Sequence, residues 1–142
     1  MNWSDFRDLI QNNLSDDLLD KKYLQMRINN PNLPKTFGHC YVVSEVAYYL
    51  LGGKETGWTP QHINHVGRSH WYLKHDSGAI LDLTASQFHT PVNYEEGKGK
   101  GFMTKEPSKR AKLLMKRINE SGWRAKFTIS QAKLDSRIIG IY

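Results

Sequence analysis

Hydrophobic residues in the first third of the chain recur at the spacing of helices. The first set is Trp3, Phe6, Leu9 and Ile10. The second set follows Ser15, a residue type that often caps helices, and consists of Leu18, Leu19, Tyr23 and Met26. The two sets predict two short helices, the second of them beginning at Ser15. Residues 29–34 contain two prolines, cannot continue a helix, and are expected to form an ordered loop.

A third helix is predicted to begin near Cys40 and to occupy the centre of the fold. Its hydrophobic residues form a wide stripe: Val43, Val46, Ala47, Leu50 and Leu51. A stripe of this width is typical of a buried helix. Gly52 and Gly53 follow directly and are expected to end the helix, because glycine is the usual residue just beyond a helix C-terminus.

The pattern then changes to that of strands. We expect strands over residues 61–66, 69–75 and 79–84, where hydrophobic and polar residues alternate. A turn at Gly67-Arg68 joins the first two, and Asp76-Ser77-Gly78 joins the second and third as a hairpin. These three segments predict a small antiparallel sheet.

The last third of the chain is predicted to hold one loop, one helix and one short strand. Glycine and lysine alternate over residues 97–101, which indicates a flexible loop. Pro107 or Ser108 is expected to begin a basic helix that ends near Gly122, and residues 127–129 to form a last strand. Helices followed by a small antiparallel sheet predict an α+β fold, with the core helix carrying Cys40 at its N-terminus and packed on the sheet.

Length and composition narrow the class of protein. A chain of 142 residues fits a single domain, which we divide into N-terminal helices and loop (1–36), a core (37–88) and a basic C-terminal region (89–142). One cysteine excludes an internal disulfide and any site built from several cysteines. No apolar run has the length of a membrane span, and the N-terminus is amphipathic and acidic, unlike a signal peptide. We therefore expect a cytoplasmic protein without membrane contact.

The positive charge is confined to the last third of the chain. Residues 1–97 hold eight Lys and Arg against eleven Asp and Glu, a net charge of −3, whereas residues 98–142 hold twelve against three, a net charge of +9. Such a region can bind a polyanion, including nucleic acid, and the candidate binding residues are Lys105, Lys109, Arg110 and Lys112. It can equally be a solvated helix face, or a rim that selects an acidic peptide or a phosphorylated ligand.

Cys40, His70 and Asp82 together predict a catalytic triad. At the start of the core helix, unpaired N–H groups and the helix dipole stabilise a Cys40 thiolate and can hold an oxyanion. A hairpin that turns about Asp76 places His70 directly opposite Asp82 on the next strand, where the carboxylate would orient the imidazole and stabilise its cation. Each residue alone also has a structural interpretation, as a small buried cysteine, a hydrogen-bonded histidine, and a carboxylate that binds Thr84 or a nearby N–H.

Two further assignments concern the surroundings of this triad. Gln25, Asn29 and Asn30 are candidates for a second oxyanion donor, with helix capping and turn formation as their alternative roles. A metal site is an alternative use of the histidines, but His62 and His65, three residues apart, point to opposite sides of a strand. We therefore expect no metal, and the thiol mechanism needs no cofactor.

Several motifs resemble the YunG-like family of small bacterial and phage proteins. They are Gly38-His39-Cys40, Leu51-Gly52-Gly53, Ser69-His70-Trp71 and the run from Leu81 to Phe88, Leu-Asp-Leu-Thr-Ala-Ser-Gln-Phe. More distantly, residues 37–88 resemble papain-like and transglutaminase-like cysteine hydrolases, which carry cysteine at a helix N-terminus and histidine and aspartate on following strands. The resemblance implies that Cys40 is the nucleophile, His70 the base and Asp82 the residue that orients it. Residues 101–111 also resemble a segment of YunG-like proteins. At the position before the cysteine, this chain has His39 where the family has glutamine.

The sequence thus predicts two functions. The first is a cysteine-dependent hydrolase or acyl transferase, acting on an amide, isopeptide or ester of a peptide or protein substrate. The second is a binding protein without catalytic activity, which uses the basic C-terminal third and has nucleic acid as its partner. Trp123 and Phe127 could stack on bases in that case, or fill the core at the end of the basic helix.

Overall fold

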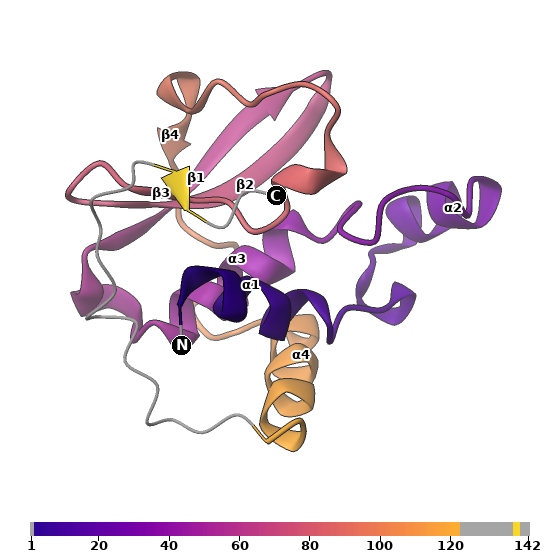
Figure 1. Cartoon of the computed structure of the whole chain (residues 1–142), viewed down its shortest axis with the longest axis horizontal. Coiled ribbons are helices and arrows are strands. Elements are labelled where there is room, and N and C mark those ends of the chain that lie inside the picture. The colour runs from indigo at the N-terminus through magenta and orange to yellow at the C-terminus, as the bar shows by residue number, and fades with distance from the viewer. Residues whose placement is uncertain (1, 123–137, 140–142) are drawn as a thin grey trace.

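The computed structural model describes residues 2–122 and 138–139, and combines helices with one sheet (Figure 1). The helices are α1 (Trp3–Gln11), α2 (Lys21–Asn29), α3 (Cys40–Leu50) and α4 (Lys109–Glu120). The strands are β1 (Trp58–His65), β2 (Arg68–His75), β3 (Ile80–Leu81), β4 (Lys98–Gly99) and β5 (Ile138–Ile139). They lie in the order β4-β1-β2-β3-β5, and every pair is antiparallel except β3 with β5. The α+β class is confirmed.

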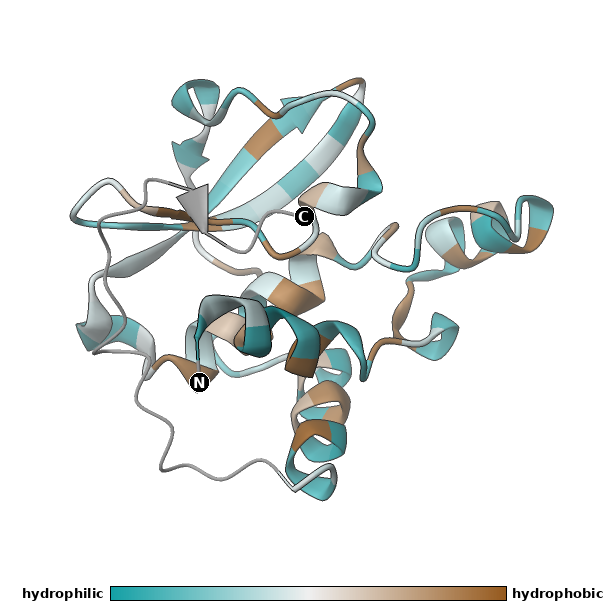
Figure 2. Cartoon of the chain, in the orientation of Figure 1, coloured by the Kyte–Doolittle hydropathy of each residue, from teal (hydrophilic) through white to brown (hydrophobic). Residues whose placement is uncertain are grey.

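Helix α3 is the centre of the main hydrophobic core, as its wide apolar stripe predicts. Val43, Val46 and Ala47 are buried against the sheet on one side and against α1 and α4 on the other. The helix α4 contributes Ala111, Leu114 and Ile118, and the hydrophobic and hydrophilic residues of α4 lie on different sides of the helix (Figure 2). The burial of α3 holds its N-terminus, with Cys40, in a fixed position beside β2.

The predicted helix from Ser15 is wrong. A short 3-10 turn at Asp16–Leu18 is followed by a break, and α2 begins only after Asp20, whose side chain accepts a hydrogen bond from Tyr23 N at 3.0 Å. Leu18 and Leu19 are both buried although they are adjacent, so the chain changes direction between them and α2. The predicted loop at residues 29–34 does follow α2 directly.

The first hairpin forms as predicted, one residue earlier. β1 and β2 pair from Trp58 with His75 to His65 with Arg68, so the turn consists of Val66 and Gly67 rather than Gly67-Arg68. Both turn residues have positive φ, 46° and 78°, which is the conformation of the tight turn that matches the twist of two paired strands.

The third strand is shorter than predicted and its register differs. Only Ile80 and Leu81 pair with β2, with Leu73 opposite Leu81, because the hairpin is centred on Ser77 and not on Asp76. After Leu81 the chain leaves the sheet, and a 3-10 turn at Ala85–Gln87 follows. This turn brings the end of the predicted strand toward the start of α3.

The glycine–lysine segment 97–101 is not simply a loop. Lys98 and Gly99 form β4 and pair with His62 and Gln61 at the outer edge of β1. The predicted strand at residues 127–129 lies outside the described residues. Among the helices described here, none has the length and apolar character needed to cross a membrane.

Candidate active site

Cys40 is the first residue of α3 and lies at the edge of a cavity. A helix leaves the N–H groups of its first turn without intrahelical partners, so these groups point out of the N-terminus around Cys40. The thiol contacts Ser69 O on β2, with a sulfur–oxygen distance of 3.9 Å. This contact places the sulfur beside the backbone of the residue that precedes His70. The predicted position of Cys40 at a helix start is confirmed.

The loop before Cys40 requires a glycine at position 38. Gly38 has a φ of +77°, and a Cβ there would lie 2.8 Å from Leu19 Cδ2 and 3.0 Å from Tyr23 Cβ. Its N–H donates a hydrogen bond of 3.3 Å to Gln87 Oε1, which comes from the segment after β3. The loop is therefore held between α2 and the segment that carries Asp82.

His70 and Asp82 form a buried hydrogen bond. His70 Nε2 lies 2.6 Å from Asp82 Oδ2, and both side chains are excluded from solvent. Asp82 Oδ2 also accepts a hydrogen bond of 2.7 Å from the Tyr94 hydroxyl, and Asp82 Oδ1 accepts one of 3.2 Å from Thr84 N. A buried carboxylate with this many donors is held in one orientation.

The pairing of His70 with Asp82 does not follow from the predicted register. Extending the observed register places Tyr72, not His70, opposite Asp82, so His70 is the diagonal neighbour two residues away. A shift of two residues keeps both side chains on the same face of the sheet, whereas a shift of one would have separated them. The predicted proximity is confirmed, while the predicted direct opposition is wrong.

The imidazole of His70 is biased toward its charged form. Burial alone would lower its pKa, but the charge and hydrogen bond of Asp82, together with the Cys40 side chain, outweigh burial and raise the pKa of His70 to about 9. Nδ1, the ring nitrogen not used by Asp82, is buried and has no hydrogen-bond partner of normal length among the described residues. The ring of Phe88 packs perpendicular to the imidazole, at a centroid distance of 4.8 Å.

Three aromatic residues that the sequence analysis did not identify support this pair. Tyr94 lies on a 3-10 turn, and its carbonyl accepts a hydrogen bond of 3.1 Å from the buried Tyr72 hydroxyl, a neighbour of His70 on β2. Burial and the charge of Asp82 raise the pKa of Tyr72 to about 12, so it remains a donor. The guanidinium carbon of Arg68 lies 4.9 Å from the ring centroid of Phe88 and 4.9 Å from that of Phe37. Tyr72 and Tyr94 carry no local sequence signal for this role, whereas Phe88 ends the quoted run from Leu81.

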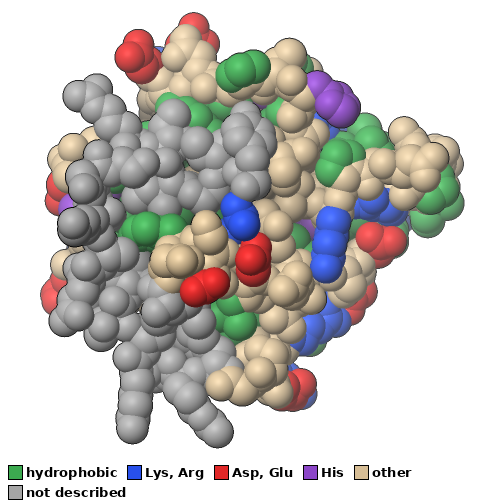
Figure 3. All heavy atoms as spheres, in the orientation of Figure 1, with side chains coloured by type: hydrophobic (Ala, Val, Ile, Leu, Met, Phe, Trp, Pro, Cys, Tyr) green, Lys and Arg blue, Asp and Glu red, His purple; other side chains and the backbone are tan. Residues whose placement is uncertain are grey.

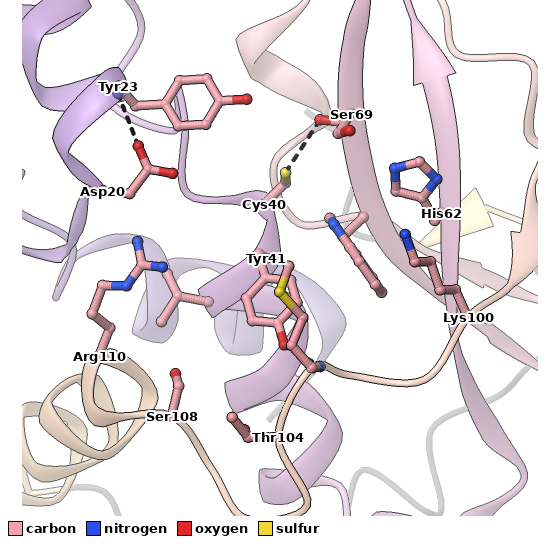
Figure 4. A pocket seen from close by; sticks show the side chains of 14 residues that line it. Asp20, Tyr23, Cys40, Tyr41, His62, Ser69, Lys100, Thr104, Ser108 and Arg110 are labelled. Carbon is pink, nitrogen blue, oxygen red and sulfur yellow. Dashed lines mark hydrogen bonds between the residues drawn. The ribbon is translucent and has the colours of Figure 1, made fainter.

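A cavity of about 400 Å³ opens beside Cys40, and the N-termini of three helices line it. They are represented by Asp20 for α2, Cys40 for α3 and Ser108 for α4. The opposite wall lies on the sheet side and includes His62 and Lys100 (Figure 4). Trp71 of β2 also lines the cavity. His70 itself does not line the cavity.

Of the four basic residues predicted to bind substrate or polyanion, only Arg110 lines this cavity. Lys105, Lys109 and Lys112 do not line it, and all three are exposed. The cause is the orientation of α4, which packs through Ala111 and Leu114 and thereby turns position 110 toward α2 and α3. Lys100, which the sequence analysis assigned to a flexible loop, lines the cavity instead.

The arginines of α4 hold the helix against the N-terminal segment. Arg110 Nη1 donates a hydrogen bond of 3.2 Å to Leu18 O, and Arg117 forms an ion pair with Asp17. The hydrogen bonds of Arg117 and Ser15 lower the pKa of Asp17 to about 2. On the face seen in Figure 3, acidic and basic side chains lie close together rather than forming a patch of one sign. Trp123 and Phe127 lie outside the described residues.

The candidates for a second oxyanion donor do not reach the cavity. Gln25 Nε2 donates to Asn29 Oδ1 at 3.1 Å on the exposed side of α2, and Asn30 Oδ1 accepts from Asn32 N at 3.3 Å. Both contacts belong to the end of α2 and the following turn. The alternative role in capping and turn formation is therefore the one observed.

Metal ligands do not gather around these residues. Within the part of the chain that the structure describes, no group of three His, Cys, Asp or Glu side chains could hold a metal ion. His62 and His65 both lie on β1 and have different surroundings, since His62 contacts Trp71 and His65 contacts Phe88.

Comparison of the chain with protein-family models, curated proteins and solved structures gives no match in any of the three. The resemblance to the YunG-like family therefore stays a prediction that depends on the quoted motifs. Function has to be argued from the geometry of the site, because a fold class alone does not determine it.

Proposed function

We propose that the protein is a cysteine-dependent acyl transferase or hydrolase, with Cys40 as nucleophile, His70 as general acid and base, and Asp82 as the residue that orients His70. The observation that carries the proposal is the buried His70–Asp82 hydrogen bond of 2.6 Å, on an imidazole whose pKa the Cys40 side chain also raises. Nucleophile, base and orienting carboxylate in this order are the parts that thiol catalysis requires.

The reaction follows from these parts. The Cys40 thiolate attacks the carbonyl carbon of an amide or ester and forms a carbon–sulfur bond, while the N–H groups at the start of α3 stabilise the oxyanion. When the tetrahedral intermediate collapses, the bond to the leaving group breaks and the leaving group takes a proton from His70. Water or an amine then attacks the thioester, gives a proton to His70 and releases Cys40. Water makes the reaction a hydrolysis, and an amine makes it a transfer.

The His70–Asp82 pair also has a consequence for the pH range of this reaction. His70 must carry a proton to give to the leaving group, and its pKa is raised to about 9. We therefore expect acyl transfer to fall as the pH rises through about 9, above the range in which an unperturbed histidine with a pKa of 6.5 would lose its proton.

Alkylation of the single cysteine tests the proposal without knowledge of the substrate. At mildly acidic pH we expect iodoacetamide to alkylate Cys40 faster than a free thiol. We expect His70→Ala to lower the rate constant by about tenfold or more, since the His70 cation that stabilises the Cys40 thiolate is lost. The matched control is His89→Ala, which removes an exposed histidine and is expected to leave the rate unchanged.

Two further measurements make the result decisive. Cys40→Ser must abolish labelling, because the chain has one cysteine. Circular dichroism of His70→Ala must show that the variant is folded. Equal alkylation rates for wild type and folded His70→Ala would contradict the triad.

A further inference from the structure

The charged side chains around Cys40 indicate what the acyl group carries. Among the described residues that line the cavity, the cations are Lys100 and Arg110 and the carboxylate is Asp20. Asp20 already uses Oδ1 to cap α2, through the bond from Tyr23 N. His62 adds no charge near neutral pH, because burial and the nearby Lys100 lower its pKa. The Cys40 thiolate is offset by the His70 cation, so one net positive charge from the remaining lining faces the cavity.

The backbone adds to this positive charge. The N-termini of α2, α3 and α4 all border the cavity, and helices of 9, 11 and 12 residues each present the positive end of their dipole there. The α4 terminus is partly neutralised, since Glu45 accepts hydrogen bonds from Ser108 N and Ser108 Oγ. The α2 terminus carries the Asp20 carboxylate as its cap, so it is the α3 terminus, which has no side-chain cap, that acts together with Lys100 and Arg110.

The two cations enter from opposite walls. Lys100 follows β4 and lies over the ring of Trp71, with Nζ 5.5 Å from the ring centroid, so its ammonium is held on the sheet side (Figure 4). Arg110 comes from α4 on the helix side, where Nη1 donates a hydrogen bond to Leu18 O, and it also lines the cavity. Cys40 lies between the two walls, and Trp71 and Tyr41 supply an aromatic surface next to it, with their rings 4.9 Å apart.

We propose that the acyl donor of this site carries a carboxylate, which Lys100 and Arg110 attract electrostatically from the two walls of the cavity while Trp71 and Tyr41 contact its apolar part. A single negative charge matches the one net positive charge of the lining, whereas the two charges of a phosphate dianion would exceed it. The inference rests on the proposed thiol chemistry at Cys40 and adds the substrate class. Acylation forms the Cys40 carbon–sulfur bond, breaks the ester bond and releases the alcohol portion.

Two esters that differ in charge test this proposal. Para-nitrophenyl butyrate is neutral, and mono-para-nitrophenyl succinate carries a carboxylate at the end of an acyl chain of similar length. Release of para-nitrophenolate, corrected with Cys40→Ser, measures acylation of the enzyme. We expect the anionic ester to react faster relative to the neutral one than it does with a free thiol. Lys100→Gln and Arg110→Gln are each expected to reduce that ratio by about two- to fivefold.

Matched variants separate a local effect from a change in net charge. Lys98→Gln removes an exposed lysine two residues before Lys100, and Lys112→Gln removes one two residues after Arg110, and neither position lines the cavity. Both are expected to keep the wild-type ratio. Added salt is expected to lower the wild-type ratio, because it screens exposed charges. A ratio that Lys100→Gln and Arg110→Gln leave unchanged would overturn the proposal.

The iodoacetamide rate distinguishes the two levels of failure. If Cys40 alkylation is fast and depends on His70 but the esters react equally, the carboxylate preference is wrong and the thiol chemistry stands. If alkylation is no faster than that of a free thiol and neither ester acylates Cys40, both proposals fall together.

Discussion

Tyr94 shows how a single residue can complete the candidate site from a distant part of the chain. Its hydroxyl donates to Asp82 Oδ2, the same oxygen that binds His70 Nε2. Gly97, three residues later, leaves room for this arrangement, because a Cβ there would lie 1.6 Å from the Tyr72 hydroxyl. The orientation of Asp82 thus depends on Tyr94, which packs on the face of the sheet that carries Tyr72 and Ile80.

We expect Tyr94→Phe to destabilise the protein by about 1.5–3 kcal/mol, since a buried carboxylate loses one of its donors. Urea unfolding at neutral pH measures this change. Tyr48→Phe, on α3 and outside this network, is the matched control and is expected to change the free energy of unfolding by less than about 0.5 kcal/mol. Equal stabilities of the two variants would show that the Tyr94 hydroxyl does not support Asp82.

At the scale of elements, α4 is joined to α3 by one buried carboxylate. Glu45, on α3, is fully buried and accepts hydrogen bonds from Ser108 N at 2.9 Å and Ser108 Oγ at 2.7 Å. Ser108 Oγ in turn caps α4 by accepting from Ala111 N at 3.2 Å. One serine therefore caps the N-terminus of α4 and fixes that end beside α3, the helix that carries Cys40.

Ser108→Ala is expected to destabilise the protein by about 1–3 kcal/mol, because it removes the cap and leaves one Glu45 oxygen without its donor. Ser121→Ala, at the exposed other end of α4, is the control and is expected to cost less. Denaturant unfolding of both variants compares them. A smaller loss for Ser108→Ala than for Ser121→Ala would contradict the role of Glu45 as the anchor of α4.

At the scale of the whole molecule, two buried histidines limit the stability of the fold at opposite ends of the pH range. Burial, and then the charge of Arg27, lower the pKa of His39 to about 4, whereas the pKa of His70 is raised to about 9. His39 precedes Cys40 and its Nδ1 has no partner among the described residues, so it is accommodated only as the neutral form. The surroundings of the start of α3 therefore favour a neutral His39 and a charged His70.

Stability is accordingly expected to be highest near pH 6.5. The contribution of His70 is fully present below its unfolded pKa of 6.5 and is lost as the pH rises through about 9. His39 acts in the opposite direction, since the unfolded chain takes up a proton first, and stability is lost as the pH falls from 6.5 to about 4. Each limb amounts to at most about 3 kcal/mol.

Urea unfolding across this pH range measures both limbs. His39→Gln is expected to flatten the acidic limb and His70→Gln the alkaline limb, while His89→Gln, at an exposed position, keeps both. An alkaline limb that persists in His70→Gln would assign the loss of stability to another group.

The sequence by itself determined the parts of this protein that depend on local order. The stripe after Cys40 and the glycines after Leu51 define α3, because periodicity and helix ends are encoded in neighbouring residues. Alternation along β2 and the Asp76-Ser77-Gly78 turn place His70 and Asp82 on one face, and this parity survives the error of two residues in register. The wrong helix start at Ser15 arose because two adjacent leucines fit a helical pattern equally well when their burial is unknown.

Only the tertiary structure decided which distant segments meet at Cys40. The donor from Tyr94, the pairing of Lys98 and Gly99 with β1, and the meeting of Asp20 with Ser108 at one cavity join residues with no pattern in common. Such contacts arise from the packing of whole elements, in which burial of apolar faces fixes the position of the polar residues attached to them. The predicted nucleophile and its partners are therefore local features, whereas the cavity that would select a substrate is a property of the fold.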